Sequence, residues 1–183
     1  MAFNVNELRS QLTFGGARNS LFQVTITNPS NTAGDIKVPF LVKAASIPSA
    51  TLGVIEVPYF GRKLRYAGDR TFADWTVTVI NDEDFLIRNA MEQWSNQINS
   101  LQGNLRTFGS SAPAQYKTTA EVTQFSRTGV PLRTYKFNGI FPSDVSMIDV
   151  NWEQTDSIEE FSVTFQYDYW EVSGGVTGNA GGI

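Results

Sequence analysis

The sequence predicts a mainly β protein, an antiparallel β-barrel or sandwich of about eight strands with one flanking α-helix over about residues 82–101. Along most of the chain apolar and polar residues alternate, as they do in half-buried strands. Clusters of Gly, Pro and Asn separate the alternating runs and indicate turns between strands. A single segment shows helical spacing instead, so we expect one amphipathic helix packed against a β structure.

The helix is predicted from apolar residues that recur at steps of four and three: Ile87, Met91, Trp94, Ile98 and Leu101. Three acidic residues, 82–84, stand at its expected start, where free backbone N–H groups and the helix dipole favour negative charge. Gly103 is its expected end. The acidic residues could also form a cation site, but they lack the ligand spacing of a calcium loop, so the helix start is the favoured interpretation.

Before the helix, the alternation predicts strands Ser20–Thr27 and Ile36–Ser46, a hairpin over Thr51–Tyr66, and a central strand Thr71–Ile80. Pro39 has no backbone N–H to donate, so we expect an edge or a bulge in the second of these strands. Pro58 and Gly61 mark the bend of the hairpin, and Gly68-Asp69 marks a further turn.

After the helix, we expect a long loop over Gly103–Thr118, followed by strands Thr119–Arg127, Arg133–Phe141, Asp144–Trp152 and Ile158–Trp170. The alternation slips near Gly139 and near Ile148, which indicates bulges. The four tryptophans are predicted to be core residues: Trp75, Trp94, Trp152 and Trp170.

The predicted organisation is an N-terminal arm over 1–19, one β domain over 20–172, and a flexible tail over 173–183 that contains five glycines. A chain of 183 residues suffices for one well-filled domain. No apolar run approaches the about 18 residues that a membrane-spanning helix needs, so no membrane partner is expected.

The composition argues against an enzyme. The chain has no cysteine and no histidine, which removes thiolate chemistry, the usual general base near neutral pH, and the commonest metal ligand. Glu159 and Glu160 are adjacent in a predicted strand and would point to opposite faces, so they are a poor pair for glycoside hydrolysis. We therefore expect no catalytic residues, no cofactor and no metal site.

Charge is distributed unevenly along the chain. The densest basic cluster is Arg62, Lys63, Arg65 and Arg70, interleaved with aromatic residues. Residues 144–171 carry eight acidic side chains and no basic one, among them Asp144, Asp149, Glu153 and Asp156. On charge alone, two solvated surfaces are the favoured interpretation. The alternatives are that the two clusters pair between copies of the chain, or that the basic cluster binds nucleic acid through backbone charge and base stacking.

Several segments together resemble the T-even-type phage tail tube proteins. They are Gly16–Val24, Arg62–Phe72, Trp75–Asp82 and Arg88–Trp94, and aromatic-rich strands near Arg133–Phe141 and Phe161–Tyr169 extend the likeness over almost the whole chain. The resemblance implies a β-barrel with a flanking helix that forms hexameric rings. It also implies that the rings stack into a rigid tube inside a contractile sheath, with DNA passing through the channel. The fold is similar to tube subunits of type VI secretion and of phage-like injection particles.

The resemblance has further implications for partners and location. It implies self-association, a place in the virion tail after assembly in the host cytoplasm, and contacts with sheath, tape measure, baseplate and tail-terminator proteins. A lumen lined by Thr, Ser, Gln and carboxylates would let DNA slide without specific binding, since phosphates are held by Lys and Arg. Given the resemblance, the basic and acidic clusters are predicted to be subunit-interface residues. The alternatives are a tube subunit of a secretion or injection particle and a β-barrel nucleic-acid-binding module.

Overall fold

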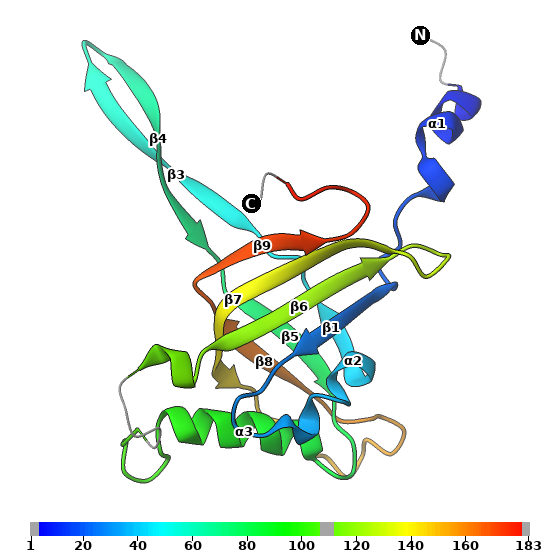
Figure 1. Cartoon of the computed structure of the whole chain (residues 1–183), viewed down its shortest axis with the longest axis vertical. Coiled ribbons are helices and arrows are strands. Elements are labelled where there is room, and N and C mark those ends of the chain that lie inside the picture. The colour runs from blue at the N-terminus through cyan, green and yellow to red at the C-terminus, as the bar shows by residue number, and fades with distance from the viewer. Residues whose placement is uncertain (1–3, 107–111, 181–183) are drawn as a thin grey trace.

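The computed structural model describes residues 4–106 and 112–180, and within them the chain forms nine strands and one main helix (Figure 1). The strands are β1 Phe22–Ile26, β2 Val42–Ala45, β3 Ala50–Tyr59, β4 Arg62–Phe72, β5 Trp75–Ile80, β6 Thr118–Phe125, β7 Pro131–Val145, β8 Glu160–Gln166 and β9 Tyr169–Gly174. The helices are α1 Val5–Gln11, α2 Val38–Leu41 and α3 Leu86–Ile98, with short 3₁₀ turns at Thr13–Gly15, Thr32–Gly34 and Pro113–Gln115. The parts of the predicted arm, loop and tail at 1–3, 107–111 and 181–183 lie outside the described residues.

The strands form two antiparallel layers that share β7 (Figure 1). The first part of β7 pairs with β6 and β9, and β6 pairs with β1. The last part of β7 pairs with β8, which continues through β5 to β2. Strand β7 is 15 residues long, which lets it cross from one layer to the other. The prediction of a mainly β, antiparallel fold with one flanking helix is confirmed.

The core lies between the two layers and is closed at one end by α3. Inward side chains are buried from both layers: Val24, Ile26, Ala120, Val122 and Phe137 from one, and Trp75, Val77, Val79, Phe161, Val163 and Phe165 from the other. The apolar stripe of α3 buries Ile87, Met91 and Trp94. The Trp94 indole N–H donates a hydrogen bond of 2.9 Å to the Tyr116 carbonyl, which satisfies the polar atom of a fully buried side chain.

The helix is shorter than predicted at both ends. It begins at Leu86, so the three acidic residues 82–84 precede it rather than occupy its first turn. The Asp84 side chain accepts from the Leu86 N–H at 3.1 Å, and Lys37 forms ion pairs with Asp82, at 2.7 Å, and with Asp84. Leu101 lies beyond the end of the helix and is 90% exposed, so its assignment to the apolar stripe is wrong.

Two predicted strands are wrong. In Ile36–Ser46, residues 38–41 form α2, because the fixed φ of Pro39 suits a first helical turn, and the strand covers Val42–Ala45 alone. In Asp144–Trp152, the strand ends at Val145 as the last part of β7, and 146–159 has no strand. The Trp152 side chain is fully exposed, so its assignment to the core is also wrong.

Other strand boundaries differ because a turn or bulge interrupts a continuous alternation. Predicted strand Thr71–Ile80 divides at residues 73–74, and Ile158–Trp170 divides into β8 and β9 around Tyr167 and Asp168. The bulge predicted near Gly139 is confirmed by a register shift in the β6–β7 pair and by its φ of 71°. A second shift lies at Pro142, where the ladder loses a donor.

Beyond β9 the chain contacts the start of β7. The Thr177 N–H and hydroxyl both donate to the Leu132 carbonyl, at 3.2 and 2.8 Å. Among the described residues, no helix has the length and apolar character needed to cross a membrane.

Candidate assembly interfaces

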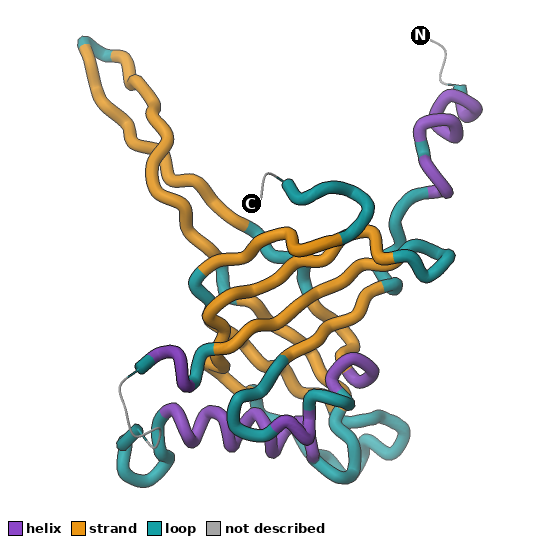
Figure 2. Tube along the Cα trace, viewed as in Figure 1, coloured by secondary structure: helices purple, strands orange, loops and turns teal. Residues whose placement is uncertain are grey.

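The β3–β4 hairpin projects away from the two layers and carries its own two-stranded sheet (Figures 1 and 2). Every residue of β3 is exposed. Residues directly opposite in an antiparallel pair share a face, and neighbouring pairs alternate between faces. Ile55 pairs with Tyr66 and Val57 pairs with Leu64, so these four side chains lie on one face, and each is 44–58% exposed. We call this the apolar hairpin face.

The opposite face of the hairpin is charged. Glu56 lies across from Arg65, and its carboxylate accepts from Arg65 Nε at 3.1 Å and from Lys63 Nζ at 2.6 Å. Arg62 lies across from Tyr59 near the tip, on the side of the apolar hairpin face. The predicted basic cluster is thus divided between two faces, and two of its cations already have an acidic partner within the hairpin.

The turn expected at Gly68-Asp69 is wrong, because both residues lie within β4. The pairing of β3 with β4 shifts its register between Leu52 and Val54, at the base of the hairpin. Arg70 lies on the body side of this shift, opposite Leu52. Gly53 and Gly68 meet there so closely that a Cβ on Gly68 would lie 3.1 Å from the Gly53 carbonyl group. The missing side chains let the two backbones approach at the base of the outer hairpin, 54–67.

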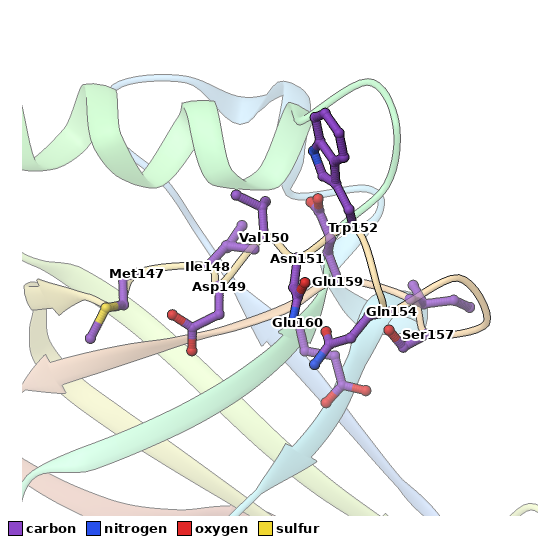
Figure 3. A pocket seen from close by; sticks show the side chains of 11 residues that line it. Met147, Ile148, Asp149, Val150, Asn151, Trp152, Gln154, Ser157, Glu159 and Glu160 are labelled. Carbon is purple, nitrogen blue, oxygen red and sulfur yellow. The ribbon is translucent and has the colours of Figure 1, made fainter.

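A second exposed surface is formed by residues 147–160, between β7 and β8 (Figure 3). These residues line a hollow of about 470 Å³. Four of its five apolar side chains are 71–100% exposed, Met147, Val150, Trp152 and Ile158, and the fifth, Ile148, is partly buried against the core. Its acidic side chains are Asp149, Glu159 and Glu160. We call this the acidic hollow.

The structure places the predicted acidic residues around this second surface. Asp149 lines the acidic hollow, Glu153 and Asp156 lie in the same segment outside its lining, and Asp144 lies on β7. All four are exposed, and none of them forms an ion pair with another described residue. The basic hairpin and the acidic segment lie at opposite ends of the molecule, so one chain does not bring them together (Figure 1).

Sequence analysis considered Glu159 and Glu160 only as a catalytic pair and did not place them beside Asp149, where both line the hollow. Glu159 accepts from Asn81 Nδ2 at 2.9 Å, and Glu160 pairs with Lys43 at 2.6 Å. Each of the two carboxylates thus has a separate partner. No signal in the sequence distinguished them from the other acids of 144–171, because the hollow depends on the absence of a strand at 146–159.

Hydroxyl side chains pair across the outward faces of both layers. Thr76 contacts Thr164 at 3.3 Å and Thr78 contacts Ser162 at 3.3 Å, both between β5 and β8. On the other layer Thr123 and Thr134 are 3.1 Å apart. No group of three or more potential ligands for a metal ion occurs among the residues described.

Comparison with known proteins assigns the chain to a class. The family described as "Phage tail tube protein" matches residues 5–173, which places the chain among structural proteins of phage tails. The chain is 37% identical over 156 residues to tail tube protein gp19 of Enterobacteria phage T4, covering 85% of this chain and 91% of the relative. It is 29% identical over 168 residues to a tail tube protein of Serratia phage KSP90, covering 89% and 93%. The chain belongs to the phage tail tube protein family.

Solved structures with the same fold come from contractile injection systems. A chain from the tube-terminating cap of the anti-feeding prophage has a TM-score of 0.64 at 17% identity, covering 94% of this chain and 98% of that one. A chain from the sheath–tube complex of an extracellular contractile injection system has a TM-score of 0.58 at 14% identity, covering 92% and 97%. At this identity the likeness concerns the fold.

Proposed function

We propose that the chain is the repeating subunit of a phage tail tube. Its copies form hexameric rings that stack into a hollow tube inside a contractile sheath, and DNA passes through the tube into the host. Family membership over residues 5–173 supports the class of function. The observation that carries self-assembly is the projecting β3–β4 hairpin, whose apolar face has no covering within the described residues.

The apolar hairpin face favours association because an isolated two-stranded hairpin is marginally stable and its exposed edges can pair with another chain. Fully burying an aliphatic or aromatic side chain contributes about 1.5–3 kcal/mol. Ile55, Val57, Leu64 and Tyr66 are about half exposed, so covering each of them in an assembly contributes on the order of 1 kcal/mol. A ring repeats this contact around its circumference, and the contacts add up to a stable particle.

The charges favour a head-to-tail arrangement. The outer hairpin at one end of the molecule carries Arg62, Lys63 and Arg65, and Arg70 lies nearer the body. The end of β7 and the segment that follows it, toward the other end, carry Asp144, Asp149, Glu153 and Asp156. A contact between two different patches is heterologous, and such contacts build closed rings or continuing stacks. We infer that the basic cluster of one copy faces the acidic cluster of the next.

The hydroxyl pairs suit the wall of a DNA channel. A channel that transports DNA must not hold its phosphates, and phosphates are held by Lys and Arg. The outward residues of the central β5–β8 pair include Thr76, Thr78, Ser162 and Thr164, which are uncharged. A lumen surfaced by such side chains lets the duplex slide.

We further propose that the subunit assembles in the host cytoplasm and contacts sheath, tape measure, baseplate and terminator proteins in the finished tail. Neighbouring folds from the cap, the baseplate and the sheath–tube complex of injection systems support such partners. They also support a second candidate of the same class, a tube subunit of an injection particle. Nucleic-acid binding is disfavoured because Lys63 and Arg65 are paired with Glu56.

Negative-stain electron microscopy over a series of protein concentrations tests the proposal. We expect hollow rings or tubes, with an apparent mass by analytical ultracentrifugation that rises with concentration. The same samples are titrated with single-stranded and duplex oligonucleotides at several salt concentrations. Protein that stays monomeric throughout and binds oligonucleotides with a steep salt dependence would instead favour the nucleic-acid-binding alternative.

A further inference from the structure

The tip of the β3–β4 hairpin presents an aromatic side chain in an unfavourable backbone conformation. Phe60 has a φ of 43° and is 91% exposed, and Gly61 follows it with a φ of 79°. A two-residue hairpin turn with positive φ at both positions strongly prefers Asn-Gly or Asp-Gly. A bulky residue at positive φ is a strained outlier, and such strain clusters at functional positions.

Phe60 has little contact with the rest of the molecule. Its ring meets the edge of the neighbouring Tyr59 ring, with centroids 4.6 Å apart, at the end of a hairpin that projects from the body. A polar residue would form the turn more easily and would be better solvated. The side chain is therefore placed to enter a pocket on another molecule.

The acidic hollow has the chemistry to receive this tip. Met147, Val150, Trp152 and Ile158 line it together with polar and acidic side chains. The carboxylate of Asp149, which has no ion pair with a described residue, suits Arg62, which follows Phe60 along β4. A second apolar hollow, of about 480 Å³, lies beside Phe14, Val130 and Leu132. Arg127 also lines that hollow, and a like charge there would repel the basic tip.

We propose that Phe60 is the anchor residue of the subunit contact, inserted into the acidic hollow of a second copy of the chain beside Trp152. This inference rests on the proposed function and identifies the partner pocket of the hairpin. The hairpin and the hollow lie at opposite ends of the molecule, so successive copies can repeat the contact indefinitely (Figure 1). Arg62 then lies near Asp149, which has no ion pair with a described residue of its own chain.

The first test is the substitution Phe60→Asn. It supplies the preferred Asn-Gly turn, so the monomer should unfold at the wild-type temperature or above it. We expect the protein concentration needed for tube formation to rise at least about tenfold, as for the loss of a buried aromatic anchor. Phe14→Asn is the matched control, because Phe14 is also 91% exposed with a positive φ of 52°. It should assemble at the wild-type concentration.

A cross-linking experiment locates the pocket, and the absence of cysteine from the chain makes it specific. Arg62→Cys is combined with Gln154→Cys, at the acidic hollow, or with Thr128→Cys, at the second hollow, and a short bismaleimide is added to assembled tubes. We expect chains linked between copies for the Gln154 pair alone.

The outcomes separate the inference from the proposed function. Phe60→Asn tubes that form at the wild-type concentration, or links formed through Thr128→Cys instead of Gln154→Cys, would overturn the anchor while the tube function stands. Wild-type protein that forms no assembly under any condition would overturn both.

Discussion

Trp75 stacks on Phe137 with ring centroids 4.3 Å apart and ring planes 26° apart. One ring comes from β5 and the other from β7, so this contact joins the two layers at the centre of the core. Both side chains are at most 1% exposed, and Trp75 also donates its indole N–H to the Ser46 carbonyl at 2.9 Å. The centre of the core is therefore held by a stacked aromatic pair, and the indole N–H of its tryptophan is satisfied.

The buried and exposed tryptophans should differ strongly in their effect on stability. Trp94→Ala should lower the free energy of unfolding by about 3–5 kcal/mol, because it opens a cavity under α3 and leaves the Tyr116 carbonyl without its donor. Trp152→Ala should lower it by less than about 1 kcal/mol, since the side chain is fully exposed. Urea unfolding followed by circular dichroism measures both. Equal losses would contradict the assigned positions.

Charge reversal of the hairpin should act on assembly and not on folding. The triple substitution of Arg62, Lys63 and Arg65 by Glu places new negative charges beside Glu56 and opposes the acidic segment of the next copy. We expect a folded monomer that forms no tubes, checked by circular dichroism and electron microscopy. The control is the reversal of Arg9 and Arg18, outside the hairpin. Normal tubes from the triple variant would remove charge pairing from the interface.

The ion pairs of Lys37 should contribute to stability within a defined pH range. Hydrogen bonds from Lys37 lower the pKa of Asp84 from its ordinary 3.8, and hydrogen bonds to Asp82 and Asp84 raise the pKa of Lys37 from its ordinary 10.5. The Asp84 contribution is present above pH 3.8 and is lost as the pH falls through its lowered pKa. The Lys37 contribution is complete below pH 10.5 and is lost as the pH rises through its raised pKa.

Lys37→Met should therefore differ from the wild type in unfolding temperature mainly between these two limits. The groups are exposed, so the difference should be small and should shrink further in high salt. Calorimetry from acid to alkaline pH measures it, with Arg9→Met as the control. A difference that stays constant across the whole range would contradict the ion-pair account.

Gly139 should tolerate substitution less well than a second glycine of similar conformation. A Cβ on Gly139 would lie 2.1 Å from Asp168 Oδ2, and Asp168 forms an ion pair of 2.6 Å with Lys117. Gly129 has a φ of 80° against 71° for Gly139, but open space around it. Alanine should cost about 1–2 kcal/mol at Gly129 from backbone strain alone, and more at Gly139 because Asp168 must move. Thermal unfolding compares the two variants, and an equal cost would exclude the clash.

The sequence predicted the elements whose pattern is set by the core. Trp75, Val77 and Val79 alternate and are buried, and the stripe from Ile87 to Trp94 packs as expected. The sequence did not reveal that 146–159 lacks a strand, since a run of apolar and polar residues looks the same whether a core or another protein chain will cover it. The same ambiguity placed Trp152 in the core.

The candidate site could be predicted only in part for a related reason. The bend at Pro58 and Gly61 located the hairpin, and composition located both charged clusters. The alternation along the hairpin distinguishes its two faces. It does not predict that the hairpin projects from the body, so that both faces are exposed. The Lys63–Glu56 and Arg65–Glu56 pairs depend on strand register, which a single sequence does not specify.

Strand β7 has a mechanical consequence. Because one continuous backbone belongs to both layers, the layers cannot slide past each other without bending a covalently linked strand. A pull applied to β6 on one side and to β8 on the other passes through their hydrogen bonds to β7 and then along the β7 backbone, in addition to side-chain packing. The two layers of the subunit therefore move together as one stiff element, a property that suits the tube function proposed above.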